Sequence, residues 1–515
     1  MILSSEKDPF YLRGYWPYVL IALAAFLLYF RTFSYGFSPM DERWIIFAEK
    51  ENLSHFSNLP KLFCTSTLGM YYRPMLSVTL MLDMISGGGS AFAFHFTNVM
   101  LHIATALLLF TFLCRLNIDR AFAFFGTLIF VVHPVNLHAV AWIPGRNDML
   151  LAPFTLLSCI SLLRYTRQRT LTSFIFHLLF FSFALFTKES AIVLPGIFLL
   201  ILLFYSEKKI SSIMLPAILW CAIVAGWFYI HLRVVNYLPP GMTDTKSSLA
   251  ARFFSSVLLH TGKIILPVQQ SVMPLLQYVS LWPYAIAIVL IIALFLIYGV
   301  RNKRTAWFGL AWFVLLLALP AWYGAIDGSG EHYEHRDYTP LPGFIILLSQ
   351  LNVRSSIQML RSIAIVIIVV FAVKTSVRMP VYADEFSYAR TGSAEAPSES
   401  LFHDLLGTEY MKRNDAANAL TSFDDAIAID PSNSDFLSHR AEAEYYLHQY
   451  QNALRDATGA LRVDHTLKDV HAIKGEALFY LGKFPEARIE LDTAKWLGVQ
   501  LPPHLDDELN DTLRK

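Results

Sequence analysis

Long apolar runs recur along the chain from residue 16 to residue 374, and none follows. A helix needs about 20 mostly apolar residues, with a range of about 17–25, to cross the hydrocarbon core of a bilayer. By this measure the pattern predicts about eleven crossings. They lie at residues 16–33, 91–114, 121–140, 149–165, 171–187, 191–205, 213–231, 281–300, 306–322, 339–351 and 363–374 with its flanking residues.

One further apolar stretch, at residues 249–267, is interrupted by Arg252, His260 and Lys263. Basic residues mark the cytoplasmic loops of a membrane protein, and here they occupy every second loop if the N-terminus is inside. The alternation requires an odd number of crossings between residues 231 and 301, so we predict that 249–267 is an outer-surface or re-entrant helix. The C-terminal tail then lies outside. The basic clusters are Lys7/Arg13, Arg115/Arg120, Arg164/Arg167/Arg169, Lys208/Lys209, Arg301/Lys303/Arg304 and Arg354/Arg361.

The tail repeats with a period of 34 residues, which is the period of tetratricopeptide repeats. Small residues recur in three registers, and each register is occupied in three copies. This pattern resembles the tetratricopeptide family of helix–turn–helix repeats, whose small residues let paired helices pack closely. The registers are Ala419/Ala453/Ala487, Ala426/Ala460/Ala494 and Gly407/Ala441/Gly475.

These patterns predict an all-α protein made of a polytopic membrane bundle followed by a soluble α-solenoid. We assign residues 1–380 to the membrane domain, with a long outer loop at 34–90. Residues 381–399, which include most of the sequence "TGSAEAPSES" at 391–400, have the composition of a linker. Residues 400–501 form three repeats, and residues 502–515 form a capping helix with a polar outer face.

Composition supports the membrane assignment and excludes several classes of protein. Hydrophobic residues make up 55% of the chain and charged residues 16%, whereas soluble domains carry about 25% charged residues. The formal net charge of +1 gives no polybasic surface for nucleic acid. The four cysteines are scattered singly, as is typical of small packing residues. From residue 401 onward the tail has 20 acidic and 12 basic residues.

Polar residues with chemical potential collect in the predicted outer loops. Asp41 and Glu42 follow the first crossing, and Arg73 stands in "YYRP" within the same loop. The alternative interpretation of the acidic pair is a surface that is exposed to solvent and has no role in chemistry. His95, Asn98 and His102 share one face of the second crossing, where the residues either bond to a neighbouring helix or line a cavity.

Three later outer loops add charges of both signs. Arg146 and Asp148 stand in "WIPGRNDML", as a site or as a local ion pair, and Lys188 and Glu189 stand in "TKES". The last loop, "EHYEHRDYTPLPG", carries Arg336. His332 and His335 in that loop have metal-ligand chemistry, but no second pair adjoins them, so a divalent metal is the disfavoured alternative.

Such residues suit chemistry on an anionic substrate anchored in the outer membrane surface. Arginine and lysine bind phosphate, and a carboxylate can accept a proton from an attacking hydroxyl. The chain has no Gly-rich phosphate loop, so a nucleotide-dependent enzyme is disfavoured.

The order of these segments resembles the transmembrane-and-tetratricopeptide O-mannosyltransferases. The segments are the acidic pair, "YRP", "FHFTNVMLH", "HPVNLHAVAWIPGRNDML", "TKES" and "EHYEHRDYTPLPGF", followed by the repeats. The resemblance implies a GT-C-like glycosyltransferase that uses a lipid-phosphate sugar. It places the catalytic base at Asp41, with Glu42 beside it, and a conserved arginine pattern at Arg336. His138 stands where the family often has Glu.

The resulting hypothesis is an inverting transfer of mannose or another hexose from a polyprenyl-phosphate carrier to Ser or Thr of an exported protein. Arg73, Arg146, Lys188 and Arg336 would bind the departing phosphate, and the repeats would bind the acceptor protein or peptide. We expect no other cofactor and no nucleic-acid partner. The remaining candidates for substrate binding are His95, Asp148 and Glu189.

Three alternatives stay open at this point. They are a membrane-anchored scaffold without catalysis, a transporter, and a glycosyltransferase acting on a glycan or lipid. The repeat array is short compared with animal members of the family, which favours a bacterial homologue in the inner membrane with periplasmic repeats. In a eukaryote the repeats would face the lumen of the endoplasmic reticulum.

Overall fold

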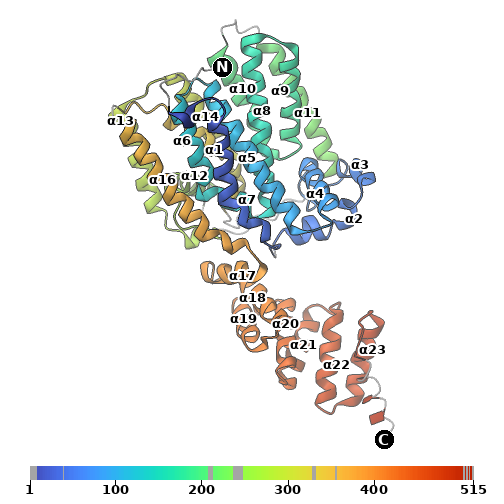
Figure 1. Cartoon of the computed structure of the whole chain (residues 1–515). Coiled ribbons are helices and arrows are strands. Elements are labelled where there is room, and N and C mark those ends of the chain that lie inside the picture. Colours follow the sequence, from blue (N-terminus) through green and yellow to red (C-terminus); the bar gives the residue numbers. More distant parts are fainter. Residues whose placement is uncertain are drawn as a thin grey trace. The chain divides into compact units, whose positions relative to one another are not determined.

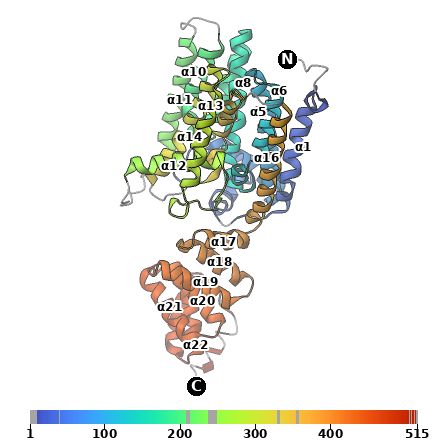
Figure 2. The same cartoon turned by 90° about the vertical axis from the view of Figure 1, so that its left-hand side faces the viewer.

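The computed structural model describes residues 9–38, 40–206, 213–235, 248–327, 332–353, 357–502, 505, 508–509 and 511–512. The chain divides into two compact units, Met1–Asp384 and Glu385–Lys515 (Figures 1 and 2). Over the described ranges the regular structure is helical, with two isolated β-bridges and no strand. The all-α prediction is therefore confirmed. Of the residues used above, Lys7, Lys208, Lys209 and Arg354 lie outside the described residues.

The first unit contains helices of the length and apolarity of membrane spans. Among the residues that the structure describes, six stretches pass this test, and a seventh passes if two helices that meet at a 49° bend count as one span. The prediction of about eleven crossings exceeds this number. Three shorter apolar helices lie at predicted crossings and account for part of the difference: Leu171–Leu185, Glu189–Tyr205 and Trp282–Tyr298. The six stretches are Trp16–Ser34, Ala91–Arg115, Ile143–Gln168, Met214–Val234, Lys303–Ile326 and Gln358–Tyr382, and the bent pair is Arg120–Val132 with Pro134–Ala141.

One predicted crossing is wrong. Helix α15 (Leu341–Leu348) has 8 residues, a length of about 12 Å at 1.5 Å per residue, which is too short for a hydrocarbon core of about 30 Å. It packs against α14 (Lys303–Asp327), and Gly309 and Gly343 permit the close approach of the two helices. The apolar run at 339–351 is therefore buried by protein, which the hydropathy pattern alone cannot distinguish from burial by lipid.

Helix α12 (Leu249–Ile265) is not among the stretches that pass the span test. It packs against α13 (Trp282–Tyr298) and α14. Ser256, His260 and Lys263 lie on one face of α12, and all three side chains are buried. The polar residues that interrupt this apolar stretch are therefore internal contacts.

The long first outer loop is a folded element. Its apolar side chains Ile46, Leu53, Leu62 and Leu80 pack in one core with Phe94 of α5 (Ala91–Arg115). Pro74 occupies the first turn of the longest helix, where its missing N–H is not needed, and Gly88 ends that helix with a φ of +59°. The elements are η3 (Arg43–Phe47), α2 (Lys50–Leu53), η4 (Phe56–Asn58), α3 (Leu59–Leu62) and α4 (Pro74–Gly87).

The second unit contains the three predicted helix pairs. The alanines of the 34-residue registers are all completely buried. A Cβ atom on Gly407 would lie 2.5 Å from the ring of Phe423, so the small residue is needed for the two helices to meet. The pairs are α18 (Ser400–Lys412) with α19 (Ala416–Ile429), α20 (Ser434–Tyr446) with α21 (Tyr450–Val463), and α22 (Lys468–Tyr480) with α23 (Phe484–Trp496).

Both ends of the repeat array add detail to the predicted boundaries. The predicted linker contains helix α17 (Glu385–Glu395), which packs on α18 because Tyr388 is buried and Gly392 lies against the ring of Phe402. At the other end, Leu505 and Leu509 are buried in the core of the last repeat, as a capping segment requires. Residues 503–504, 506–507, 510 and 513–515 of the predicted capping helix lie outside the described residues.

Candidate active site

The acidic pair of the first outer loop is largely buried. Glu42 is 1% exposed, and its Oε2 accepts a hydrogen bond of 2.6 Å from Ser38 Oγ. Ser38 Oγ in turn accepts a hydrogen bond of 3.1 Å from Trp142 Nε1. Burial raises the pKa of Glu42 to about 8, so this carboxyl group is mainly protonated at neutral pH and is a poor base there.

Asp41 differs from Glu42 in its electrostatic surroundings. Burial also raises the pKa of Asp41, but the positive charge of Arg73 acts in the opposite direction. Two adjacent carboxyl groups with different surroundings can take different roles. Asp41 is the better candidate for a base, and Glu42 helps to hold the loop through Ser38 and Trp142.

Arg73, directly before α4, is bound to Glu189 at the start of η7 (Glu189–Val193). Arg73 Nη2 and Nε lie 2.8 Å and 3.0 Å from Glu189 Oε2. The other oxygen of Glu189 accepts a hydrogen bond of 3.3 Å from the backbone N–H of Tyr72. Glu189 therefore orients Arg73, which is a different role from the substrate contact that we expected.

Lys188 makes the second ion pair, with Asp148 near the start of α8 (Arg146–Gln168). Lys188 Nζ lies 2.6 Å from Asp148 Oδ2, and His335 Nε2 lies 3.8 Å from the same oxygen. Burial lowers the pKa of Lys188; Asp148 opposes this shift, while Arg73 and Arg336 add to it. Glu189, the partner of Arg73, directly follows Lys188, and His335, the neighbour of Arg336, lies 3.8 Å from Asp148 Oδ2, so the three cations converge on one region.

Two tyrosines connect the two arginines of this region. The guanidinium of Arg73 lies 3.9 Å from the ring centroid of Tyr71, and that of Arg336 lies 5.5 Å from the centroid of Tyr323. The hydroxyl groups of Tyr71 and Tyr323 are 3.1 Å apart. The first outer loop and the last one are thereby joined at the site.

The turn that carries Arg336, η10 (Glu334–Asp337), is fastened to one face of α12. The sequence showed the interrupting polar residues of α12 but not their partners. Each of the three buried residues on α12 bonds to one residue of the last outer loop. The contacts are Ser256 Oγ with His332 Nδ1 at 3.0 Å, His260 Nδ1 with Asp337 Oδ1 at 2.9 Å, and Lys263 Nζ with Glu334 Oε1 at 2.7 Å.

Arg146, which we predicted to bind phosphate, lies apart from these cations in a fully enclosed network of side chains. Its side chain is completely buried, and its bonds connect α8 with α4 and α5. Its Nη1 is 2.5 Å from Asp83 Oδ2 on α4, and its Nε donates to Asn98 Oδ1 on α5 at 2.7 Å. Its Nη2 donates to the backbone carbonyl of Phe94 at 2.8 Å. These bonds occupy the guanidinium and make Arg146 a structural residue.

His95 also has a positioning role. Its side chain is 1% exposed, and Nε2 lies 3.0 Å from the backbone oxygen of Gly36. The contact ties α5 to the segment directly before the acidic pair. The same helix face carries Asn98, bound to Arg146, and His102, whose Nδ1 lies 2.8 Å from the hydroxyl of Tyr338. The i, i+3, i+7 spacing of these three residues therefore reflects the contacts that α5 makes with neighbouring segments of the membrane unit.

No group of three metal-ligating side chains occurs among the residues that the structure describes. His332 and His335, the pair with metal-ligand spacing, point to different partners, Ser256 and Asp148. Glu331 of the same loop lies outside the described residues.

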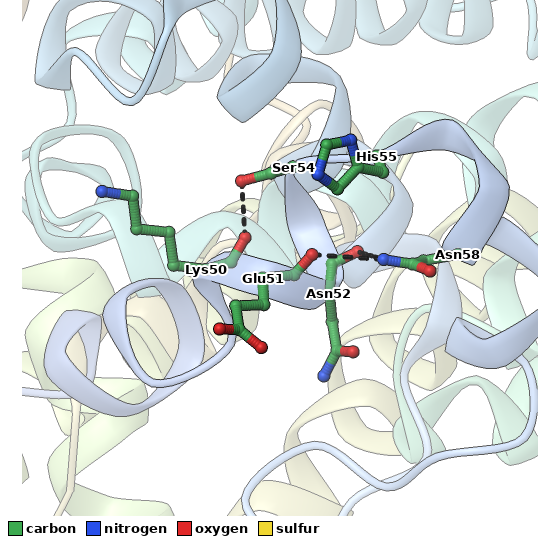
Figure 3. Close-up of a pocket in the computed structure, with 6 residues that line it drawn as sticks. All are labelled: Lys50, Glu51, Asn52, Ser54, His55 and Asn58. Carbon is green, nitrogen blue, oxygen red and sulfur yellow. Dashed lines mark hydrogen bonds between the residues drawn. The ribbon is translucent and has the colours of Figure 1, made fainter.

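A polar hollow of about 690 Å³ lies elsewhere in the first outer loop (Figure 3). Its walls come from α2 and η4, and hydrogen bonds of Ser54 to the backbone of Lys50 and of Asn58 to the backbone of Glu51 hold these elements together. None of the charged residues of the candidate site lines it. The lining residues are Lys50, Glu51, Asn52, Ser54, His55 and Asn58.

Known proteins that are similar to this chain carry one functional name. Mouse Protein O-mannosyl-transferase TMTC1 is 33% identical over 186 residues, which cover 33% of this chain and 19% of the relative. Mouse Protein O-mannosyl-transferase TMTC3 is 27% identical over 194 residues, covering 36% and 20%. The Drosophila melanogaster protein Tmtc1 is 30% identical over 176 residues, covering 33% and 20%.

Over the matched regions the chain is similar to proteins named O-mannosyl-transferases. The matched region spans about a fifth of the length of these relatives, and no family model matches the chain. Among solved structures, the second TPR of Spaghetti (RPAP3) bound to an HSP90 peptide is 25% identical, covers 20% of this chain and 98% of that one, and has a TM-score of 0.19. The first TPR of the same protein is 22% identical, covers 22% and 91%, and has a TM-score of 0.21.

The TM-scores are too low to support an argument, so the assignment of the repeats rests on the helix pairs and buried alanines described above. For the O-mannosyltransferase resemblance, the structure adds the spatial relation of the motifs. The segments with Arg73, Lys188 and Arg336 are linked by the ion pairs of Glu189 and Asp148 and by the contact of Tyr71 with Tyr323, whereas Arg146 bonds to Asp83 and Asn98 in a separate network.

Glu42→Gln is expected to change the pH dependence of stability. The carboxyl group titrates near its ordinary value of 4.5 in the unfolded chain and near 8 in the folded one, so unfolding between these pH values releases a proton. Its contribution to stability is fully present below pH 4.5 and is lost as the pH rises to about 8. Melting temperatures at pH 5 and pH 8 should differ less for Glu42→Gln than for the unchanged protein. An equal difference in both proteins would show that Glu42 is ionised when folded.

Proposed function

We propose that this chain is an integral-membrane glycosyltransferase. It transfers a sugar, mannose or another hexose, from a polyprenyl-phosphate carrier to Ser or Thr hydroxyls of exported proteins, with inversion at the anomeric carbon. The observation that carries the proposal is the linkage of Arg73, Lys188 and Arg336 through Glu189, Asp148 and the contact of Tyr71 with Tyr323, beside apolar helices of membrane-span length. The positive charge of Arg73 also acts on the pKa of Asp41. The similarity to proteins named O-mannosyl-transferases supports the reaction class.

The chemistry assigns a role to each charged group. Asp41 accepts the proton of the acceptor hydroxyl, whose oxygen attacks the anomeric carbon from the side opposite the phosphate. The bond between the anomeric carbon and the phosphate oxygen breaks, and the electron pair leaves with the lipid phosphate. Arg73, Lys188 and Arg336 stabilise the negative charge that develops on that oxygen.

The ion pairs explain why the cations can act together. Three adjacent positive charges repel one another, and burial adds to the cost of each. Glu189 and Asp148 offset this cost at Arg73 and Lys188. A pure membrane anchor would gain nothing from such buried charges, so the cluster favours the enzyme over a scaffold.

The proposal also assigns a region for binding the acceptor and a side of the membrane for the reaction. The repeat unit is the part of the chain suited to bind an acceptor protein, because stacked helix pairs form an extended surface. The alternation of basic loops supports placing the repeats and Asp41 on the outer side. In a bacterium this is the periplasmic side of the inner membrane.

The proposal is tested with the full-length protein in lipid nanodiscs. Polyprenyl-phosphate mannose and polyprenyl-phosphate glucose are supplied separately, each with a Ser/Thr-containing peptide and with an exported protein of the source cell. We expect a hexose increment on a hydroxyl residue, found by peptide mass spectrometry, with one donor preferred. Transfer only from a nucleotide sugar would refute the donor class, and transfer only to a glycan or lipid would refute the acceptor class.

A further inference from the structure

Two histidines that the reaction scheme does not use face each other beside the cations. His138, on α7 (Leu137–Ala141), is 1% exposed. Its ring centroid lies 5.0 Å from that of His335 on η10, and the two planes are nearly perpendicular at 78°. The ring of Trp142 contacts both, with centroid distances of 4.7 Å and 5.5 Å.

The ring nitrogens of the pair are not used inside the fold. Within the described ranges, both nitrogens of His138 and Nδ1 of His335 have no hydrogen-bond partner. Most buried polar side-chain atoms in proteins do have one. Three such atoms on two adjacent rings therefore point to polar groups of a ligand.

The protonation state of His335 fits a hydroxyl ligand. Burial lowers the pKa of His335 well below its ordinary value, and its interactions with His138 and with the cations Lys188, Arg336 and Arg73 add to this shift. A neutral imidazole has one nitrogen that donates and one that accepts. A sugar hydroxyl can both accept and donate, so it matches a neutral imidazole in either orientation.

The pair lies between the two chemical halves of the site. On one side, His335 Nε2 lies 3.8 Å from Asp148 Oδ2, the partner of Lys188, and His335 directly precedes Arg336. On the other side, the indole of Trp142 bonds to Ser38, which bonds to Glu42 beside Asp41. During an inverting transfer the sugar lies between the departing phosphate and the attacking hydroxyl, and thus between these same two groups of residues.

We propose that His138 and His335 bind hydroxyl groups of the donor sugar and determine which sugar is accepted. The proposal rests on the proposed function. Stacked and tilted rings of Trp142, Tyr333 and Tyr382 surround the pair and fix the orientation of the imidazoles. Histidines that serve only to fill this aromatic cluster would be replaceable by phenylalanine.

The test separates contacts to the sugar from contacts to the phosphate. For His138→Phe and His335→Phe, two quantities are measured in full-length protein: the KM of the sugar-bearing donor and the inhibition constant of polyprenyl phosphate, which has no sugar. We expect the KM to rise about tenfold for each variant, because a hydrogen bond to the sugar is lost. The inhibition constant should change less than about twofold, because polyprenyl phosphate lacks the sugar hydroxyls. His138→Gln, which restores a polar group, should recover part of the loss.

Two comparisons guard against general damage to the fold. His177→Phe removes a buried histidine whose Nδ1 lies 2.8 Å from Ser158 Oγ and whose Nε2 accepts from Trp220, so it should lower the melting temperature without changing the ratio of the two constants. Lys188→Met should raise both constants. Donors that lack a single sugar hydroxyl should bind the unchanged protein more weakly than the complete donor does. For the donor that lacks the hydroxyl bound by His138, the KM should not rise further in His138→Phe, because the same hydrogen bond is already absent.

The outcomes distinguish the two proposals. An unchanged KM in both phenylalanine variants would make the pair packing residues and overturn the inference. An equal rise in KM and inhibition constant would overturn it as well, because the pair would then act on the phosphate or on the fold. Absence of transfer by the unchanged protein from any polyprenyl-phosphate sugar would instead refute the proposed function.

Discussion

Asp41→Asn is expected to lower the rate of sugar transfer by about 10²–10⁴-fold, the range associated with a positioned general base. Asparagine preserves the size of the side chain but has no basic oxygen, so the acceptor hydroxyl has no proton acceptor when its oxygen attacks. The loss should appear in kcat, with little change in the KM of the lipid-linked donor, because the carboxylate does not hold the phosphate. Single-turnover transfer by the purified variant measures the effect.

Glu42→Gln is the matched control for this result. The two residues are adjacent, but Glu42 is mainly protonated at neutral pH and needs only its hydrogen bond to Ser38, which glutamine can still accept. Its transfer rate should stay within about tenfold of the unchanged protein, the cost of one altered hydrogen bond. A large loss in Glu42→Gln with near-normal transfer in Asp41→Asn would exchange the two roles.

Arg146→Met is expected to destabilise the membrane unit by about 3–5 kcal/mol, the usual cost of removing one partner of a buried ion pair. Asp83 would be left charged and buried, and Asn98 and the carbonyl of Phe94 would lose their donor. Thermal unfolding in detergent measures the loss. Transfer by the fraction that remains folded should show a normal donor KM.

The double variant Arg146→Met with Asp83→Leu provides the control, because replacing both members of a buried pair by apolar residues is often neutral or stabilising. Its melting temperature should exceed that of Arg146→Met alone. Normal stability of Arg146→Met together with a raised donor KM would instead restore the role in phosphate binding that the sequence suggested.

The comparison of Arg73 with Arg146 shows how far the sequence could lead. Both arginines stand in predicted outer loops, and their charge outside the lipid made both candidates for the site. Their partners lie 116 residues and 63 residues away in the chain, at Glu189 and Asp83, and no local pattern records such pairings. The 3.6-residue period and the 34-residue repeat are local, which is why the helices and the repeats were predictable.

Other differences have equally physical causes. His260 and Lys263 were visible as interruptions of the apolar stretch at 249–267, but the contribution of Ser256 and the partners of all three in the last outer loop became known only from the structure. The linker prediction relied on small and polar residues, and the same small residues let α17 pack on α18. Small residues are thus compatible with either a flexible linker or a closely packed helix. Which of the two forms depends on whether another helix packs against the segment, as α18 does here.

The contact between Tyr71 and Tyr323 joins residues that are 252 positions apart. During synthesis, the first outer loop reaches the membrane long before the turn with Arg336 has been made. Under the proposed function, an emerging chain would therefore carry the base without the full set of cations, and a donor lipid would meet only a partial site. Competence for transfer would begin late in biogenesis, when α12 and the last outer loop have docked, so incompletely inserted chains would be unable to modify the proteins exported beside them.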